Sequence, residues 1–253
     1  MHRHDWDNPE VFAINREPAH CNRMPFPKKI QPNQTRESSP SYKSLNGTWQ
    51  FNWSSCPERR PEGFYTGDFD YSNWNSIDVP ANWQLQGFGK PIYCNVQYPF
   101  TTTPTGDVPH LFNPVGSYIR TFSIPESWQD QPVYLHFAGV KSAFYCWLNG
   151  KKVGYSQDSM TPAEFDISEF LQPGENRLAV EVYRWSDGSY LECQDMWRFS
   201  GIFREVFLFT CANVHFRDYF IQANLDDQYQ NGQLNIEVTI KNDKNTTAKG
   251  CTI

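Results

Sequence analysis

Short segments in which apolar and polar residues alternate recur along the chain from about residue 47 to residue 209. In Thr48-Trp49-Gln50-Phe51-Asn52-Trp53 every second side chain is aromatic, as expected for a strand with one buried face. The same pattern predicts further strands at residues 117–122, 133–137, 144–148, 151–155, 177–183 and 202–209. Helical periodicity is weak, and only residues 166–171 predict a short helical turn. Many short strands joined by turns predict an all-β fold, an antiparallel β-sandwich of the jelly-roll type.

Turns and long connections separate these strands. Asn149-Gly150 between two strand patterns predicts a tight hairpin, because both turn residues must accept a positive φ. Long loops are predicted at residues 54–78, 84–116 and 185–201. Loops of that length in a compact domain are usually functional or form interfaces.

The pattern divides the chain into three parts. Residues 1–40 are polar and rich in proline, which predicts an extended arm, although Asp5-Trp6-Asp7-Asn8-Pro9 suggests a local anchor. Residues 41–212 form the predicted jelly-roll domain. Residues 213–253 show two strand patterns and the start of a third. Because an immunoglobulin-like sandwich needs about seven strands, we expect this last part to be a truncated domain of that type.

Composition excludes several classes of function. The chain has 253 residues, a formal charge of −6 and no basic run, which argues against a nucleic-acid partner. Its apolar runs are too short to cross a membrane, and its N-terminus lacks a signal pattern, so a cytoplasmic location is expected. The seven cysteines include no CxxC pair, which favours packed thiols over a zinc site or a disulfide framework.

Candidate chemistry is concentrated between Arg184 and Phe203, in the stretch RWSDGSYLECQDMWRFSGIF. The stretch combines five aromatic residues with three acidic ones and two arginines, without a clean strand or helix period. Sugar C–H faces pack on aromatic rings, and sugar hydroxyls donate to carboxylates. Carbohydrate is therefore the leading ligand class.

Seven blocks occur in order along the chain: residues 5–9 (DWDNP), 44–49 (SLNGTW), 79–84 (VPANWQ), 91–96 (PIYCNV), 113–116 (NPVG), 154–159 (GYSQDS) and the stretch 184–203. Together they give the chain a resemblance to the N-terminal part of the glycoside hydrolase family 2 β-galactosidases, the large bacterial lactose-cleaving kind. The resemblance implies a jelly-roll sugar-binding domain, an immunoglobulin-like domain and then a TIM barrel that holds the catalytic glutamates. The implied activity is hydrolysis of terminal non-reducing β-D-galactosides such as lactose. No catalytic residue is expected in this chain. Its expected partners are the β-galactoside substrate, the barrel of the full chain and, in the full enzyme, further copies.

The resemblance also implies that two loops reach the active site of the barrel. Asn95 and Val96 lie on one loop, where Asn95 is expected to form hydrogen bonds with galactose hydroxyls. Asp195 on the other loop is expected to bind a galactose hydroxyl and Na⁺. From spacing alone, Asn95 could instead bond its own backbone in a turn. Asp195 could instead form an ion pair with Arg198 or Arg204.

A Mg²⁺ site that ties down the arm is implied as well. Its ligands would be Asp5, Asn8, the Val11 carbonyl, Gln157 and Asp187. All offer oxygen, which Mg²⁺ prefers. The alternative is that Asp5 and Asn8 cap a turn and that Asp187 lies in a Ser-Asp-Gly turn. Cys193 stands where the family more usually has an acidic residue, which lowers the negative charge near Asp195.

Two other functions remain open from the sequence. The chain could be a stand-alone carbohydrate-binding module, or a subunit-interaction module without catalysis. Trp83 and Trp197 lie in loops and could face a sugar or the barrel, although packing is favoured for both.

Overall fold

The computed structural model describes residues 4–26, 31–100, 107–244 and 247. Its strands are β1 Ala13–Ile14, β2 Tyr42–Ser44, β3 Gly47–Ser54, β4 Asn75–Val79, β5 Tyr93–Cys94, β6 Val115–Phe122, β7 Val133–Phe137, β8 Val140–Lys141, β9 Ala143–Leu148, β10 Lys151–Ser156, β11 Ala163–Asp166, β12 Asn176–Tyr183, β13 Met196–Trp197, β14 Gly201–Ile202, β15 Val206–Thr210, β16 Val214–Leu225 and β17 Gly232–Asn242. The helical turns are η1 Asp5–Asp7, η2 Arg36–Ser38, η3 Pro57–Arg59, η4 Trp83–Gln86, η5 Glu126–Trp128, η6 Ser168–Phe170 and α1 Ser189–Glu192. The end of the predicted unit 213–253, beyond Lys244, lies outside the described residues apart from residue 247.

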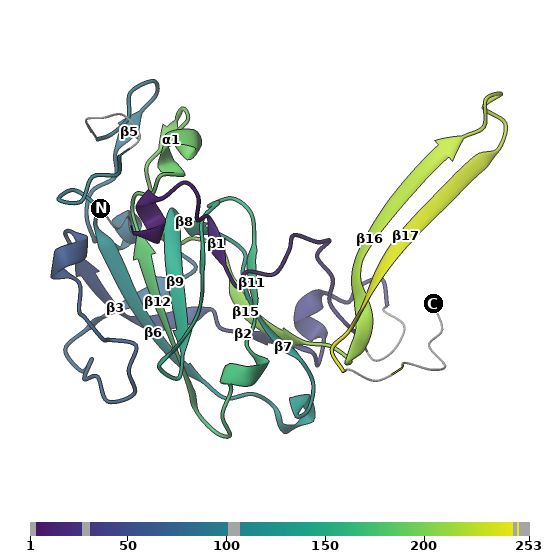
Figure 1. The fold of residues 1–253 in the computed structure, drawn as a ribbon, viewed down its shortest axis with the longest axis horizontal. Helices are drawn as coiled ribbons and strands as arrows, with labels where there is room; N and C mark the ends of the chain where they lie inside the picture. The colour runs from purple at the N-terminus through teal and green to yellow at the C-terminus, as the bar shows by residue number, and fades with distance from the viewer. Residues whose placement is uncertain (1–3, 27–30, 101–106, 245–246, 248–253) are drawn as a thin grey trace.

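Two antiparallel sheets face each other across one main core. The larger sheet has the order β1-β10-β9-β12-β6-β3-β4, and the smaller has the order β11-β7-β15-β2. Inward-facing side chains from both sheets, such as Phe51 from β3 and Phe137 from β7, form a single apolar cluster. The predicted all-β sandwich is confirmed, and Figure 1 shows the two layers.

Alternation of apolar and polar residues correctly predicted the three eight-residue strands of the larger sheet. The predictions at residues 48–53, 117–122 and 177–183 correspond to β3, β6 and β12, and the short turn at 166–171 contains η6. Asn149 and Gly150 form the predicted hairpin turn between β9 and β10, with φ of 52° and 83°. The single strand predicted over 202–209 is wrong, because the segment divides: β14 pairs with β8, and β15 pairs with β7.

The N-terminal arm is attached to the edge of the larger sheet. Ala13 and Ile14 pair with β10, and Gln157 N donates to Phe12 O at 2.9 Å. Trp6 is only 1% exposed and stacks on Tyr183 of β12. The expected anchor in the Asp5–Pro9 block is therefore confirmed.

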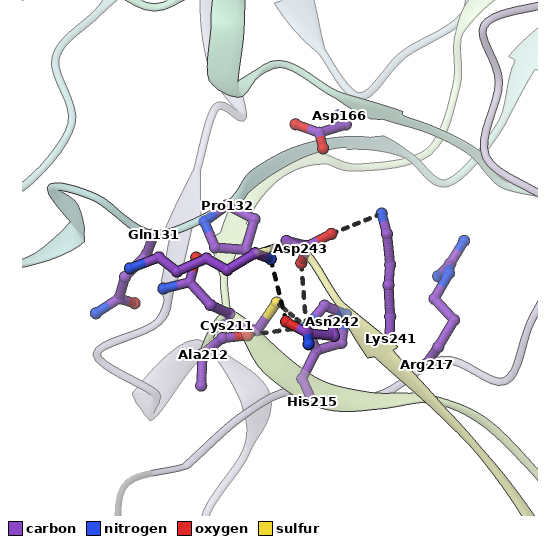
Figure 2. Close-up of polar contacts among 12 residues, drawn as sticks. Gln131, Pro132, Asp166, Cys211, Ala212, His215, Arg217, Lys241, Asn242 and Asp243 are labelled. Carbon is purple, nitrogen blue, oxygen red and sulfur yellow. Dashed lines mark hydrogen bonds and ion pairs between the residues drawn. The ribbon is translucent and has the colours of Figure 1, made fainter. Parts of the chain in front are cut away.

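The last two strands form a long hairpin that extends away from the sandwich (Figure 1). Figure 2 shows the polar contacts where this hairpin begins. His215 Nδ1 donates to Ala212 O at 2.8 Å and lies 3.5 Å from Asp243 Oδ2, and Lys241 Nζ lies 3.2 Å from Asp243 Oδ1. These contacts tie the two ends of the hairpin to each other beside the small sheet.

Among the residues described, no helix is long and apolar enough to cross a membrane. The six described cysteines are free thiols, as the absence of paired spacing indicated, and Cys251 lies outside the described residues.

Candidate functional site

A two-stranded ladder brings together the two loops that the resemblance singled out. Strands β5 and β13 pair antiparallel, with Cys94 opposite Met196 and Tyr93 opposite Trp197. The next position on each strand is Asn95 on one side and Asp195 on the other. Residues a hundred positions apart therefore lie side by side at one end of the sandwich, where β5 and α1 project (Figure 1).

Arg198, the residue that follows β13, connects the two strands of this ladder. Its side chain is fully buried and donates to Met196 O at 2.5 Å and to Cys94 O at 2.7 Å, one carbonyl from each strand. A guanidinium has five N–H donors in a fixed plane, so a single side chain can fix both strands. The sequence-based interpretation of Arg198, as a possible partner of Asp195, missed this role.

The structure supports the alternative role predicted for Asn95 but not the one predicted for Asp195. Asn95 Oδ1 accepts a hydrogen bond from Val96 N at 2.9 Å, the local contact typical of a turn residue. Asp195 is exposed and accepts from the Tyr93 hydroxyl at 2.5 Å, and Arg204 donates to Met160 O. Among the described residues no ion pair of Asp195 with either arginine is found. The hydrogen bond from Tyr93 to Asp195 raises the pKa of the tyrosine.

Several large apolar side chains on the two loops of the ladder are exposed. Val96 is 87% exposed, and Tyr93, Tyr98, Leu191 and Trp197 are exposed as well. Exposed apolar side chains on paired loops are typical of an interaction surface. Trp83, by contrast, is 0% exposed and packs in the core, as favoured from the sequence.

Parts of the predicted magnesium set also lie together. Gln157 Nε2 donates to Asp187 Oδ1 at 2.6 Å and lies 3.5 Å from Asp5 O, and Asp187 N donates to Trp6 O at 2.9 Å. The Asp5 carboxylate accepts from the Tyr145 hydroxyl at 3.0 Å. The predicted ligands on the arm and on the sandwich are thus already in contact.

Further predicted ligands follow η1 directly. Val11 N donates to Asn8 O at 2.9 Å, and Asn8 Oδ1 accepts from Glu10 N at 3.3 Å, which is the turn arrangement named as the alternative. Within the described residues no group of three or more His, Cys, Asp and Glu side chains could hold a metal ion. The predicted set differs from such groups because three of its five members would contribute amide or main-chain oxygens.

Two observations favour a cation in this region. Burial raises the pKa of Asp187, and the neighbouring negative charge of Asp7 adds to the rise. Asp7 Oδ1 is buried and has no hydrogen-bond partner. A buried carboxylate oxygen without a donor is costly, and a bound cation would compensate it. The oxygen donors present therefore fit Mg²⁺ in chemical type.

Cys211, His215 and Asp243 lie together where the hairpin begins. These residue types can form a catalytic thiol with a general base, but a catalytic thiol also needs accessible surroundings that lower its pKa. Cys211 Sγ lies 3.4 Å from His215 Nδ1 (Figure 2). Cys211 is only 2% exposed, and burial raises the pKa of its thiol to about 11. A reactive cysteine needs a lowered pKa and access, so this cluster is structural.

Comparison with known proteins agrees with these observations. The profile of the family described as "Glycosyl hydrolases family 2, sugar binding domain" matches residues 42–212. The chain is 48% identical over 243 residues to a β-galactosidase of Priestia megaterium and 46% identical over 239 residues to one of Halalkalibacterium halodurans. These alignments cover 94% and 91% of this chain but only 24% and 23% of the two relatives.

Solved structures support the fold. A Bacteroides uniformis β-glucuronidase 2 covalently bound to cyclophellitol-6-carboxylate aziridine superposes with a TM-score of 0.62 at 24% sequence identity, covering 80% of this chain and 22% of that one. At this identity the similarity concerns the fold alone. The family match and the close relatives together show that this chain belongs to glycosyl hydrolase family 2 and carries its sugar-binding domain.

Proposed function

We propose that this chain is the N-terminal sugar-binding part of a β-galactosidase that hydrolyses terminal non-reducing β-D-galactosides such as lactose. Asn95, Val96 and Asp195 form its contribution to the substrate site, and the catalytic glutamates lie in a barrel outside this chain. The observation that carries the proposal is the β5–β13 ladder, which brings Asn95 and Asp195 together on loops that also carry exposed apolar side chains. The relatives named β-galactosidase support the substrate class.

The proposal includes two cations. Asp195 would take part in holding Na⁺ beside the sugar, since an exposed carboxylate suits a hard cation. The proposed Mg²⁺ would supply positive charge between the arm and the sandwich. Its ligands would be Asp5, Asn8, the Val11 carbonyl, Gln157 and Asp187. The cytoplasmic location and the homo-oligomeric full enzyme expected above are part of the same proposal.

A chimera tests the function directly. This chain replaces the matching quarter of the Priestia megaterium β-galactosidase, and hydrolysis of a chromogenic β-galactoside is measured. We expect an active chimera, and no hydrolysis by the 253-residue chain alone. Asp195→Asn should lower kcat/KM by about 10- to 100-fold, because hydrogen bonds to a charged group contribute about 1.5–3 kcal/mol. Asp227→Asn, on the exposed end of the hairpin, is the matched control.

The result also separates the alternative functions. A folded chimera without activity, whose parts assemble normally, would favour the stand-alone carbohydrate-binding or subunit-interaction module. Turnover by the isolated chain that disappears in Asp195→Asn would contradict the assignment of catalysis to the barrel.

Magnesium binding is expected to stabilise the chain. A ligand at about 100 times its Kd adds about 2.7 kcal/mol to the free energy of unfolding, so Mg²⁺ should raise the Tm and EDTA should reverse the rise. Asp187→Asn should remove the response. Without metal, the same change should cost little, because burial already disfavours the charged form of Asp187.

Calorimetric titration and thermal unfolding measure both effects, and Asp227→Asn again serves as the control. An unchanged Mg²⁺ response in Asp187→Asn would show that the predicted ligands do not hold the ion.

A further inference from the structure

A groove lies on the outer face of the larger sheet, the face turned away from the main core. Strands β9 and β12 form its floor, the N-terminal arm covers one side and residues 60–65 cover the other. Its volume is about 470 Å³. That size lies within the range of known small-molecule sites. None of its lining residues belongs to the set Asn95, Val96 and Asp195.

Aromatic side chains make up much of the lining. Tyr145 and Trp147 come from β9 and Tyr183 from β12, while Trp6 comes from the arm and Tyr65 from the loop. Tyr65 stacks on Trp147 at a centroid distance of 4.8 Å, and Trp6 stacks on Tyr183 at 5.2 Å. These stacked pairs give the groove rigid walls from segments far apart in the sequence.

A buried carboxylate lies on the floor among these rings. Glu181 is only 5% exposed, and it accepts a hydrogen bond from the Tyr183 hydroxyl at 2.6 Å. Arg60 Nε lies 3.2 Å from its second oxygen. A carboxylate has about four acceptor positions, so these two contacts leave capacity for further donors.

The ion pair between Glu181 and Arg60 costs desolvation free energy, because the carboxylate of Glu181 is buried on the face of a sheet. Burial raises the pKa of Glu181 despite its contacts with Tyr183 and Arg60, which reflects the cost of the charge there. Well-packed apolar residues often replace a buried ion pair with no loss of stability. A charged pair kept on the floor of an open aromatic groove is therefore better explained by ligand recognition than by folding.

We propose that this groove is a second saccharide-binding site, which takes a neutral hexose unit such as those of lactose. Tyr65, which stacks on Trp147 with one ring face, offers its other face to the C–H face of the sugar, and Glu181 accepts hydrogen bonds from the sugar hydroxyls. Arg60 and Lys152 donate to hydroxyl oxygens from the other side. Lys152 Nζ lies 4.5 Å from the centroid of the Tyr145 ring and 3.6 Å from Asp5 Oδ2, and an ammonium with three N–H donors has capacity for a sugar hydroxyl as well.

The balance of charge favours a neutral ligand over a charged one. The lining holds two cationic side chains, Arg60 and Lys152, and two anionic ones, Glu62 and Glu181. A charged group in the groove would lie near side chains of its own sign as well as of the opposite sign, so the lining favours neither a uronate nor an ammonium ligand. A polyhydroxyl compound can use both kinds of group without either repulsion.

Titration of the 253-residue chain with lactose tests the site, with calorimetry for affinity and saturation-transfer NMR for contact. We expect saturable binding that weakens by about tenfold in Glu181→Gln, since one charge-assisted hydrogen bond is lost. Glu175→Gln, an exposed change just before β12, should bind as the unchanged chain does. The titration measures binding by the 253-residue chain and not hydrolysis by the chimera, which keeps it separate from the test of the proposed function.

Lys152→Ala provides a second variant in case Glu181→Gln does not fold. The Lys152 side chain is 42% exposed, so its removal leaves the core intact, and a severalfold weaker affinity is expected. Absence of saturable lactose binding would overturn the proposal. So would normal affinity in both groove variants, or glucuronate binding as tight as that of lactose.

Discussion

Gly154→Ala is expected to detach the N-terminal arm from the sheet edge and to lower the free energy of unfolding by about 1–3 kcal/mol. A Cβ at this position would meet the carbonyl oxygen of Ile14 in β1 and lie 2.5 Å from Cε1 of Phe165. Phe165 is fully buried in the main core and has little room to move. The least costly adjustment is therefore a displacement of β1.

Hydrogen exchange of residues 11–15 and trypsin cleavage after Arg16 measure this displacement. Both should increase strongly in Gly154→Ala, because β1 consists of two residues and has few contacts to lose. Gly67→Ala is the matched control, since a Cβ there meets nothing within 4 Å. Unchanged protection of residues 11–15 would mean that the core, and not the arm, absorbs the extra methyl group.

The same variant connects the arm to the proposed magnesium site. Asp5 and Val11 lie on the arm, whereas Gln157 and Asp187 belong to the sandwich. Release of β1 should therefore weaken Mg²⁺ binding without any change to a ligand. A Gly154→Ala chain with a mobile arm and normal Mg²⁺ affinity would indicate that the arm supplies none of the ligands.

Prediction from sequence worked where a strand is long and one of its faces is buried. Strand β3 alternates Trp49 and Phe51 with polar residues, and this period of two is visible without any knowledge of its neighbours. Strands of two or three residues, such as β5, β8 and β13, cannot show a period. They exist because a partner distant in sequence supplies the hydrogen bonds. The division of residues 202–209 between β8 and β7 has the same cause.

The candidate site was also hard to predict, because it depends on contacts between residues distant in sequence. Spacing alone favoured a turn role for Asn95, and only the resemblance linked Asn95 to Asp195. The structure adds Arg198, which joins the two loops through carbonyl contacts that no sequence pattern reveals. Trp83 was ambiguous for a related reason, because its buried position depends on Gly116 and Gly201 of distant strands, where a Cβ would lie within 2.8 Å of the indole.

The outer groove could not be predicted either. Tyr145, Trp147, Glu181 and Tyr183 occupy the outward positions of β9 and β12. In sequence, aromatic residues on both faces of a strand indicate a strand buried on both sides. Two separate segments, the arm and residues 60–65, cover parts of this face and leave the groove between them.

Glu164→Gln is expected to destabilise the chain by about 3–5 kcal/mol, because it removes the one carboxylate shared by several buried partners. The Glu164 side chain is 6% exposed and lies 2.9 Å from His20 Nε2, 3.2 Å from His136 Nδ1 and 3.3 Å from Arg217 Nη1. These partners belong to the arm, to β7 and to β16, so one acid connects three parts of the molecule. Its loss leaves Arg217, whose side chain is 11% exposed, with Glu17 as its one acidic partner among the described residues.

The pH dependence of this loss distinguishes the ion-pair network from simple packing. Burial alone would raise the pKa of Glu164, but hydrogen bonds from His136 and His20 outweigh it and lower the pKa to about 2. A lowered acid pKa stabilises the folded state above the unfolded value of about 4.5, and the stabilisation is lost as the pH falls toward 2. Urea unfolding at several pH values should therefore show a gap between the original chain and Glu164→Gln that narrows below pH ~4.5. The exposed Glu169→Gln is the control, and a gap that stays constant down to pH ~2 would show that the charge of Glu164 does not hold the arm and hairpin.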